Sequence, residues 1–425
     1  MDFQEKNQNK KNNDTGVFFS GLLVGVLATI ALVGVIALGV VAYNVFVVAP
    51  KAGEQQALQD LQADAEGGMV DTEMMEKLEA LEAIIDIYYY KDDLEQEALE
   101  EGVYRGLMEA VGDPYTCYYT EEEVEELWEQ TIGVYYGIGA YVSLDETGLY
   151  PMITSPIAGS PAEEADLRPG DILYEVNGES TYGMDLDSVV ALIKGEEGTT
   201  VDLTIARSSE NDYLYVTVER RRVEAPSVNS EMFDNGMAYI QITEFSDATV
   251  DQFADALATA KGAGMKGLII DLRANPGGAL SSVVNIARML LPKGLIVYTE
   301  DKYGERDEYS CDGKNEFKLP LVVLVDGNSA SASEVLAGAI KDYGIGTLVG
   351  TTTFGKGIVQ QIIDIKDGSA VKVTTSSYYS PKGTNIHGTG IEPDIVCEFD
   401  GEAYYNEDYD NQLEYAKEVL AGMIK

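Results

Sequence analysis

The stretch DGNSASASEVLAGAI, from Asp326 to Ile340, places three serines on alternate positions before an apolar run with helical spacing. The residues before it, LVVLVD at 321–326, are typical of a buried strand, so the serines fall on a strand-to-helix turn. Ser331 and Glu334 fit a capping box, in which Ser331 would have a structural role only. The same turn can instead present a serine nucleophile at the sheet edge, where the next backbone N–H stabilises an oxyanion.

The sequence around this turn indicates an α/β domain. Strand-like and helix-like segments follow one another in this order: strand 237–243, helix 249–264, strand 266–273, helix 280–290, strand 294–299 and strand 319–326. Uninterrupted apolar runs such as Leu268–Leu272 predict a core sheet that is covered by helices.

Composition limits the function. The 425 residues include 29 basic and 73 acidic side chains, a net charge of −44, which excludes a nucleic-acid-binding protein because phosphate contact requires a basic face. The three cysteines lie far apart and form no C-x-x-C motif, so neither a zinc knuckle nor a disulfide framework is indicated. The single histidine, His387, excludes a histidine-rich metal site, and its turn-rich surroundings favour a structural or surface position. No metal or other cofactor is expected.

A long uncharged segment near the N-terminus indicates a membrane anchor. No residue from Gly16 to Pro50 is charged, whereas a membrane span needs only about 20 apolar residues. We therefore expect a transmembrane helix region at 17–48 and a linker at 49–70. Three lysines precede the span, so residues 1–16 are predicted to be cytoplasmic and the rest extracytoplasmic. Whether this helix is retained or cleaved stays open.

Residues 71–131 follow a helical pattern. A break at Gly112-Asp113-Pro114 separates two short helices, and Thr120 with Glu123 forms a capping box for the second. This segment indicates no chemistry. Its aromatic run at 88–90 is interpreted as packing or as a contact in a homodimer.

Residues 132–222 change to short strands and turns, with a tight-turn signal at Asn177-Gly178 and an amphipathic helix at Asp185–Lys194. Together with the core SPAEEADLRPGDIL (160–173), this segment resembles a PDZ domain. The resemblance implies that the loop Gly137-Ile138-Gly139 offers backbone N–H groups to the C-terminal carboxylate of a peptide, which adds as a strand.

A lysine is the best candidate for a base that activates the serine. Lys356 lies between two glycines in GTTTFGKGIVQ (350–360). A P-loop would require Ser or Thr where Gly357 stands and a helix where a strand-like run follows. A desolvated lysine can act as a base, and Gln360, on the same strand face, could hold its amine.

From about Glu73 onward the chain resembles the carboxyl-terminal processing peptidases, or tail-specific proteases. The resemblance rests on four motifs: LIIDLRANPGG (268–278), NSASASEVLAGAIKDYG (328–344), GTTTFGKGIVQ (350–360) and GTGIEPDI (388–395). It implies a multi-domain α/β (α+β) protein with a crotonase-like serine protease core at 223–400 and a helical segment at 401–425. The implied site residues are the following: nucleophile Ser331, base Lys356, orienting Gln360, and oxyanion donors Ala332 and Gly277 or Gly278. Asp342 is interpreted as structural, because three helical turns separate it from Ser331.

The expected protein is therefore a membrane-anchored, extracytoplasmic serine endopeptidase with a Ser-Lys dyad, acting on proteins with exposed C-terminal tails. The PDZ-like segment is expected to bind the tail and gate activity, with Arg168 as the candidate sensor. The alternative is a catalytically silent PDZ scaffold that binds C-terminal peptides at the membrane.

Overall fold

The computed structural model describes residues 70–91 and 94–424. The predicted cytoplasmic tail and transmembrane region lie outside these residues. Among the described helices, none combines the length and the hydropathy of a membrane span. The chain divides after Leu94 into two units. In the first, helix α3 (Thr72–Tyr88) is capped by Asp71, whose carboxylate accepts a hydrogen bond from the N–H of Met74 at 2.8 Å.

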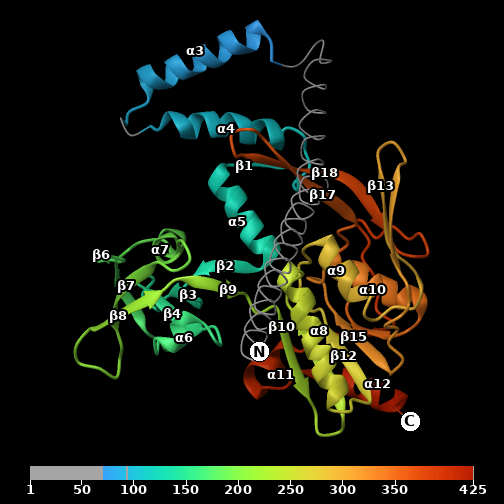
Figure 1. The fold of residues 1–425 in the computed structure, drawn as a ribbon. Coiled ribbons are helices and arrows are strands. Elements are labelled where there is room, and N and C mark those ends of the chain that lie inside the picture. The colour runs from blue at the N-terminus through green and yellow to red at the C-terminus, as the bar shows by residue number, and fades with distance from the viewer. Residues whose placement is uncertain (1–69, 92–93, 425) are drawn as a thin grey trace, which may run out of the picture. The chain divides into compact units, whose positions relative to one another are not determined.

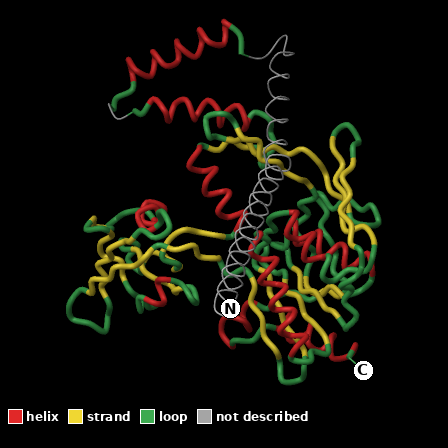
Figure 2. Tube along the Cα trace, in the orientation of Figure 1, coloured by secondary structure: helices red, strands yellow, loops and turns green. Residues whose placement is uncertain are grey.

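The second unit is built around a six-stranded sheet in the order β10-β11-β12-β15-β16-β19. Figure 1 labels β10, β12 and β15 of this sheet, and Figure 2 draws the strands in yellow. The strands span these residues: β10 Val228–Met232, β11 Met237–Ile242, β12 Gly267–Asp271, β15 Leu321–Val325, β16 Thr347–Gly350 and β19 Ile395–Val396. β10 is antiparallel to β11, and the other neighbours are parallel. β12 and β15 are buried along their whole length, which confirms the predicted covered sheet.

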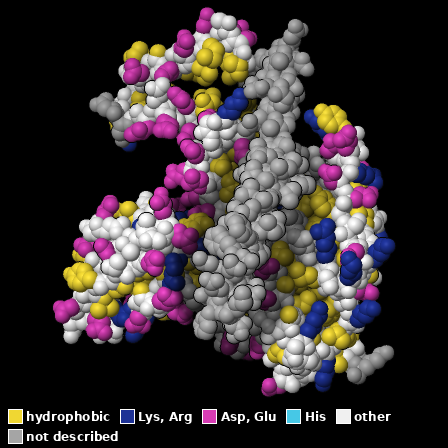
Figure 3. All heavy atoms as spheres, in the orientation of Figure 1, with side chains coloured by type: hydrophobic (Ala, Val, Ile, Leu, Met, Phe, Trp, Pro, Cys, Tyr) yellow, Lys and Arg dark blue, Asp and Glu magenta, His cyan; other side chains and the backbone are white. Residues whose placement is uncertain are grey.

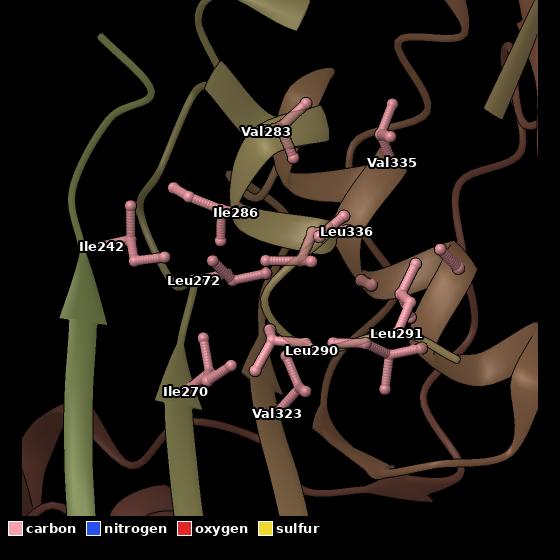
Figure 4. Packing of buried hydrophobic residues seen from close by; sticks show 14 of the residues in the cluster. Ile242, Ile270, Leu272, Val283, Ile286, Leu290, Leu291, Val323, Val335 and Leu336 are labelled. Atoms are coloured by element: carbon pink, nitrogen blue, oxygen red, sulfur yellow. The ribbon is translucent and has the colours of Figure 1, made fainter. Parts of the chain in front are cut away.

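Alternate side chains of β12 enter two different cores, because successive strand residues point to opposite faces. Leu268 and Ile270 pack with helices α8 (Asp247–Gly262), α9 (Leu280–Ala287) and α10 (Ala332–Tyr343). Figure 4 shows Ile242, Ile270 and Val323 of the strands against helix residues such as Ile286 and Leu336.

On the opposite face, Ile269 packs with Ala416 and Leu420 of α12 (Asn411–Met423), which follows the short helix α11 (Gly401–Glu407). An ion-pair cluster fixes this packing. Arg273, two residues after the end of β12, donates through Nη2 to Asp271 at 2.6 Å and to Asp410, the N-cap of α12, at 2.8 Å.

A second, antiparallel sheet has the order β1-β18-β13-β14, with β17 also paired to β18. Its strands are β1 Cys117–Tyr119, β13 Gly294–Asp301, β14 Arg306–Cys311, β17 Ile358–Asp364 and β18 Ala370–Tyr379. β1 lies between α4 (Gln96–Glu109) and α5 (Glu121–Ile132), so a short strand separates the two expected helices. The capping box predicted for α5 is confirmed: Thr120 N–H donates to the Glu123 carboxylate at 2.9 Å, and Glu123 N–H to the Thr120 hydroxyl at 3.3 Å.

The PDZ-like segment is a separate sheet in the order β3-β4-β5-β7-β8, with β6 paired to β5. Its elements are β3 Ala140–Leu144, β4 Pro151–Pro156, α6 Pro161–Glu164, β5 Ile172–Val176, β6 Glu179–Ser180, α7 Leu186–Ile193, β7 Thr200–Ala206 and β8 Leu214–Glu219. The two-stranded ribbon β2 (Val134–Gly137) and β9 (Arg221–Glu224) flanks it in sequence. Asn177 and Gly178 both have positive φ, as the predicted tight turn requires. Figure 3 shows many acidic side chains over this segment.

Candidate active site

The turn before α10 singles out one of its three serines. Ser329 is fully buried and donates to the Leu272 carbonyl at 2.7 Å, and Ser333 is fully buried and donates to the Asn275 carbonyl at 3.0 Å. Ser331 instead lines a cavity, and its backbone has φ 53° and ψ −113°. A positive φ is costly for a residue with a Cβ, about 1–3 kcal/mol, and such residues cluster at active sites.

The neighbouring loop at 274–278 is ordered by Asn275. Its amide donates to the Ile242 carbonyl at 2.8 Å, and its side-chain oxygen accepts the Gly277 N–H at 2.8 Å. Its carbonyl accepts the N–H of Ala330 at 3.0 Å. A Cβ on Gly277 would lie only 2.8 Å from the Cβ of Ser331, so glycine permits this close approach.

Two backbone donors beside Ser331 have no acceptor within the described part of the chain: the N–H groups of Ala332 and Gly278. The N–H of Gly277 is already bonded to Asn275, so of the two glycines that the resemblance left open, Gly278 carries the free donor. Free N–H groups at a helix start attract negative charge. The cavity can therefore accept an oxyanion near Ser331.

A buried carboxylate joins the serine turn to the lysine loop. Glu334 is 1% exposed and accepts the N–H of Ser331 and the N–H of Lys356, both at 2.9 Å. It also accepts the N–H of Gly355 at 2.7 Å and the hydroxyl of Thr353 at 2.6 Å. Glu334, the capping-box partner of Ser331, therefore also positions the backbone of Lys356, the candidate base.

The buried phenol of Tyr378 makes a second connection between the serine turn and the lysine loop, through two backbone carbonyl groups. The hydroxyl of Tyr378 contacts the carbonyl of Ser331 at 2.9 Å and also the carbonyl of Lys356. Burial raises the pKa of Tyr378 well above its ordinary value, so the phenol stays protonated and can donate. Glu334 and Tyr378 together fix the backbones of Ser331 and Lys356 relative to each other.

The side chain of Lys356 lies over an aromatic ring. Its Nζ is 4.4 Å from the centroid of Tyr115 and makes no hydrogen bond within the described residues. Burial lowers the pKa of Lys356, and the positive charge of Lys372 lowers it further, while Asp113 opposes the shift. The amine thus has an environment that favours its neutral, basic form.

The segment Asp113–Tyr119, for which the sequence indicated no chemistry, contacts the candidate base Lys356 and two residues of β18, Lys372 and Thr374. Besides the contact of Tyr115 with Lys356, Asp113 accepts the Thr374 hydroxyl at 2.6 Å. Lys372 Nζ donates to the Tyr119 hydroxyl at 2.5 Å. The side-chain N–H of Gln360 donates to the Thr374 hydroxyl at 3.4 Å, and Gln360 makes no hydrogen bond with Lys356 among the described residues.

The cavity has a volume of about 420 Å³ and contains Ser331, the free donors and Gln360. Its apolar lining includes Leu127, Phe245, Leu280, Val335, Ile358 and Val359. Lys356 does not line it.

Asp342 and His387 have other contacts. Asp342 accepts the backbone N–H of Lys382 at 2.8 Å, a structural contact. The side chain of His387 is exposed, although its backbone N would lie 2.6 Å from a Cβ on Gly357.

A second cavity, of about 480 Å³, lies in the PDZ-like segment between the start of β3 and α7. The carbonyls of Ile138 and Gly139 accept the N–H groups of Ala162 and Ile157 at 2.8 and 2.9 Å. Their own N–H groups have no acceptor among the described residues.

Arg168 is not part of this cavity lining. Its side chain is 56% exposed and pairs with Asp166 at 2.6 Å.

A strained serine beside open oxyanion donors, tied to a loop that carries a desolvated lysine, is the arrangement expected of a serine-type hydrolase. Comparisons with known proteins define the class further. Residues 236–397 match peptidase family S41, and residues 152–207 match the PDZ domain. The chain is 36% identical over 320 residues to the carboxy-terminal processing protease CtpA of Bacillus subtilis, covering 75% of this chain and 68% of that protein.

A CtpA-like serine protease of Staphylococcus aureus is also 36% identical, over 77% of this chain and 66% of that protein. Among solved structures, the photosystem II D1 C-terminal processing protease is 30% identical, with coverage of 77% of this chain and 94% of that chain and a TM-score of 0.45. The chain belongs to the carboxy-terminal processing proteases of peptidase family S41, and it is a serine-type peptidase.

Proposed function

We propose that the chain is a membrane-anchored extracytoplasmic endopeptidase in which Ser331 and Lys356 form the catalytic dyad. The observation that carries this proposal is the double connection through Glu334 and Tyr378, which joins the serine turn to the lysine loop. The anchor is the uncharged segment at 17–48, and its lysine-rich N-terminal flank favours a cytoplasmic N-terminus.

In the proposed reaction, neutral Lys356 accepts the proton of the Ser331 hydroxyl as its oxygen attacks the substrate carbonyl. The N–H groups of Ala332 and Gly278 stabilise the oxyanion that forms. Collapse of the intermediate transfers that proton to the leaving amine and gives an acyl-enzyme. Water then hydrolyses the ester, with Lys356 again as the base. For this chemistry Lys356 Nζ must leave the ring of Tyr115 and reach Ser331, and Gln360 would orient it there.

We propose that the PDZ domain binds the C-terminus of the substrate. The N–H groups of Ile138 and Gly139 support this role, because such donors suit a carboxylate and have no acceptor among the described residues. Both residues line the cavity beside α7, the PDZ groove. Gly137 precedes them at the end of β2. Arg168 is the proposed sensor of the bound tail. In this role the Arg168 side chain would exchange its exposed ion pair with Asp166 for a new contact.

A comparison of one peptide with a free and an amidated C-terminus tests this proposal. We expect amidation to slow cleavage by the wild-type enzyme strongly and Arg168→Ala to be slow on both forms. The control is Arg306→Ala, which removes an arginine of similar side-chain exposure, 53% against 56%, from β14. Equal wild-type rates on both peptides would show that the PDZ domain is a passive spacer.

We also propose a homodimer. Helix α3 has no buried residue, and the side chains of Ile84 and Ile87 are 53% and 69% exposed, so its apolar surface suits a second copy of the chain. Light scattering of the purified ectodomain should give a dimer mass that falls to the monomer mass after substitution of these isoleucines by glutamine. A monomer at all concentrations would reject this part of the proposal.

A further inference from the structure

Glu244 follows β11, and the backbone next to it is hydrogen-bonded to the loop at 274–278 and to Ala279. The next residue, Phe245, donates its N–H to the Gly277 carbonyl at 2.8 Å, and its own carbonyl accepts the Ala279 N–H at 2.7 Å. The carbonyl of Glu244 accepts the Thr249 hydroxyl at 3.1 Å. The backbone that carries this carboxylate is therefore held directly beside the residues that surround Ser331.

Glu244 is also common to the two cavities. It lines the active-site cavity together with Ser331, and it lines the PDZ groove together with Gly137, Ile138 and Gly139. No other described residue lines both. Glu244 therefore lies between the two cavities, where a substrate would run if its C-terminus occupied the groove while an upstream bond lay at Ser331.

Among the residues that the structure describes, the carboxylate of Glu244 makes no hydrogen bond or ion pair. It is half-buried, and burial raises its pKa. The nearby Lys194, which lines the same groove, is instead paired with Glu129 at 2.6 Å. A desolvated carboxylate without a partner is stabilised when a cation binds beside it.

We propose that Glu244 is a specificity residue that binds a lysine or arginine side chain of the substrate, located between the cleaved bond and the C-terminus held by the PDZ domain. This inference rests on the proposed function for the path of the substrate. It assigns a class of substrate, tails with a basic residue on the C-terminal side of the scissile bond, that neither the apolar lining of the cavity nor the PDZ groove specifies.

Peptides that differ at one position test the inference. All peptides have the same cleavage site and a free C-terminus. One residue between the cleavage site and the C-terminus is lysine, norleucine or glutamate, and separate sets of peptides place this residue at successive positions. For wild-type enzyme we expect the ratio of kcat/KM for lysine over norleucine to reach about tenfold at one position, as a charge-assisted contact allows. Glu244→Gln should reduce this ratio to about one, and Glu244→Lys should favour glutamate over lysine at that position.

The acidic surface of the protein requires a matched control, since the net charge of −44 attracts any cationic peptide. Glu126→Gln removes the same charge from an exposed position of α5 that lines neither cavity. The inference predicts that this variant keeps the lysine preference. Loss of the preference in Glu126→Gln as large as in Glu244→Gln, or no wild-type preference at any position, would overturn the inference.

Binding separates this inference from the proposed function. Fluorescence anisotropy with Ser331→Ala enzyme measures the affinity for the same peptides without turnover. A lysine preference in binding that disappears in the Ser331→Ala, Glu244→Gln double variant supports the subsite even if no peptide is cleaved, an outcome that would reject the proposed function alone. Cleavage without any lysine preference rejects the subsite alone.

Discussion

The three serines of the turn differ in what their hydroxyls contact, and this difference predicts their roles. Ser331→Ala should abolish proteolysis, a loss of at least about 10⁴-fold in kcat if the hydroxyl is the nucleophile. Ser329→Ala and Ser333→Ala should keep activity and lose about 1–3 kcal/mol of stability, because each leaves a buried hydrogen bond unmade. Rates on a disordered protein and melting temperatures check the series, and an active Ser331→Ala enzyme would refute the assignment.

Lys356 should act as a base in its neutral form, so activity should rise with pH as its ammonium loses a proton. Lys356→Arg should be as inactive as Lys356→Ala, because a guanidinium stays charged. Burial lowers the pKa of Lys356, the positive charge of Lys372 lowers it further, and the negative charge of Asp113 raises it. Removing the cation in Lys372→Met should therefore move the rising limb of kcat/KM to higher pH, and Asp113→Asn should move it to lower pH. Shifts in one direction for both variants would contradict this account.

At the scale of elements, the strand-to-helix turn and the covered sheet could be predicted from the sequence, because runs of apolar residues and capping patterns are local signals. The role of the segment Asp113–Tyr119 could not. Its contacts with Lys356 and Thr374 span more than 200 residues and depend on β1 pairing with β18. The local signal, Gly-Asp-Pro followed by aromatic residues, indicates only a turn. Similarly, a capping box at Ser331 and Glu334 does not show that the same carboxylate also holds Lys356.

The ring of Tyr115 should affect both the pKa and the position of the Lys356 amine. Tyr115→Phe keeps the aromatic face and should retain the wild-type pH profile. Tyr115→Leu removes a ring contact that stabilises the ammonium, so the pKa of Lys356 should fall and the rising limb should move to lower pH. A pH profile of kcat/KM for both variants measures this effect. If both variants lose the same activity without a shift in the profile, Tyr115 has a packing role only.

At the scale of the whole molecule, the predicted topology places every residue after the span outside the cytoplasm. In a background with Cys117, Cys311 and Cys397 replaced by serine, Ala57→Cys in the linker should react with a membrane-impermeant maleimide on intact cells. Asn9→Cys should react only after lysis. The reverse pattern would invert the topology. The sequence carries this prediction alone, since residues 17–48 lie outside the described part of the chain.

The backbone angles of Ser331 also affect the choice of an inactive enzyme for capturing substrates in cells. Alanine at this position removes the hydroxyl and keeps the Cβ, so the strain of a positive φ remains. Glycine removes both, and Ser331→Gly should melt at a higher temperature than Ser331→Ala, the opposite of the usual order for these two residues. A more stable inactive variant would keep the oxyanion donors in place. It would also retain bound substrate tails during the long purifications that are needed to identify natural substrates.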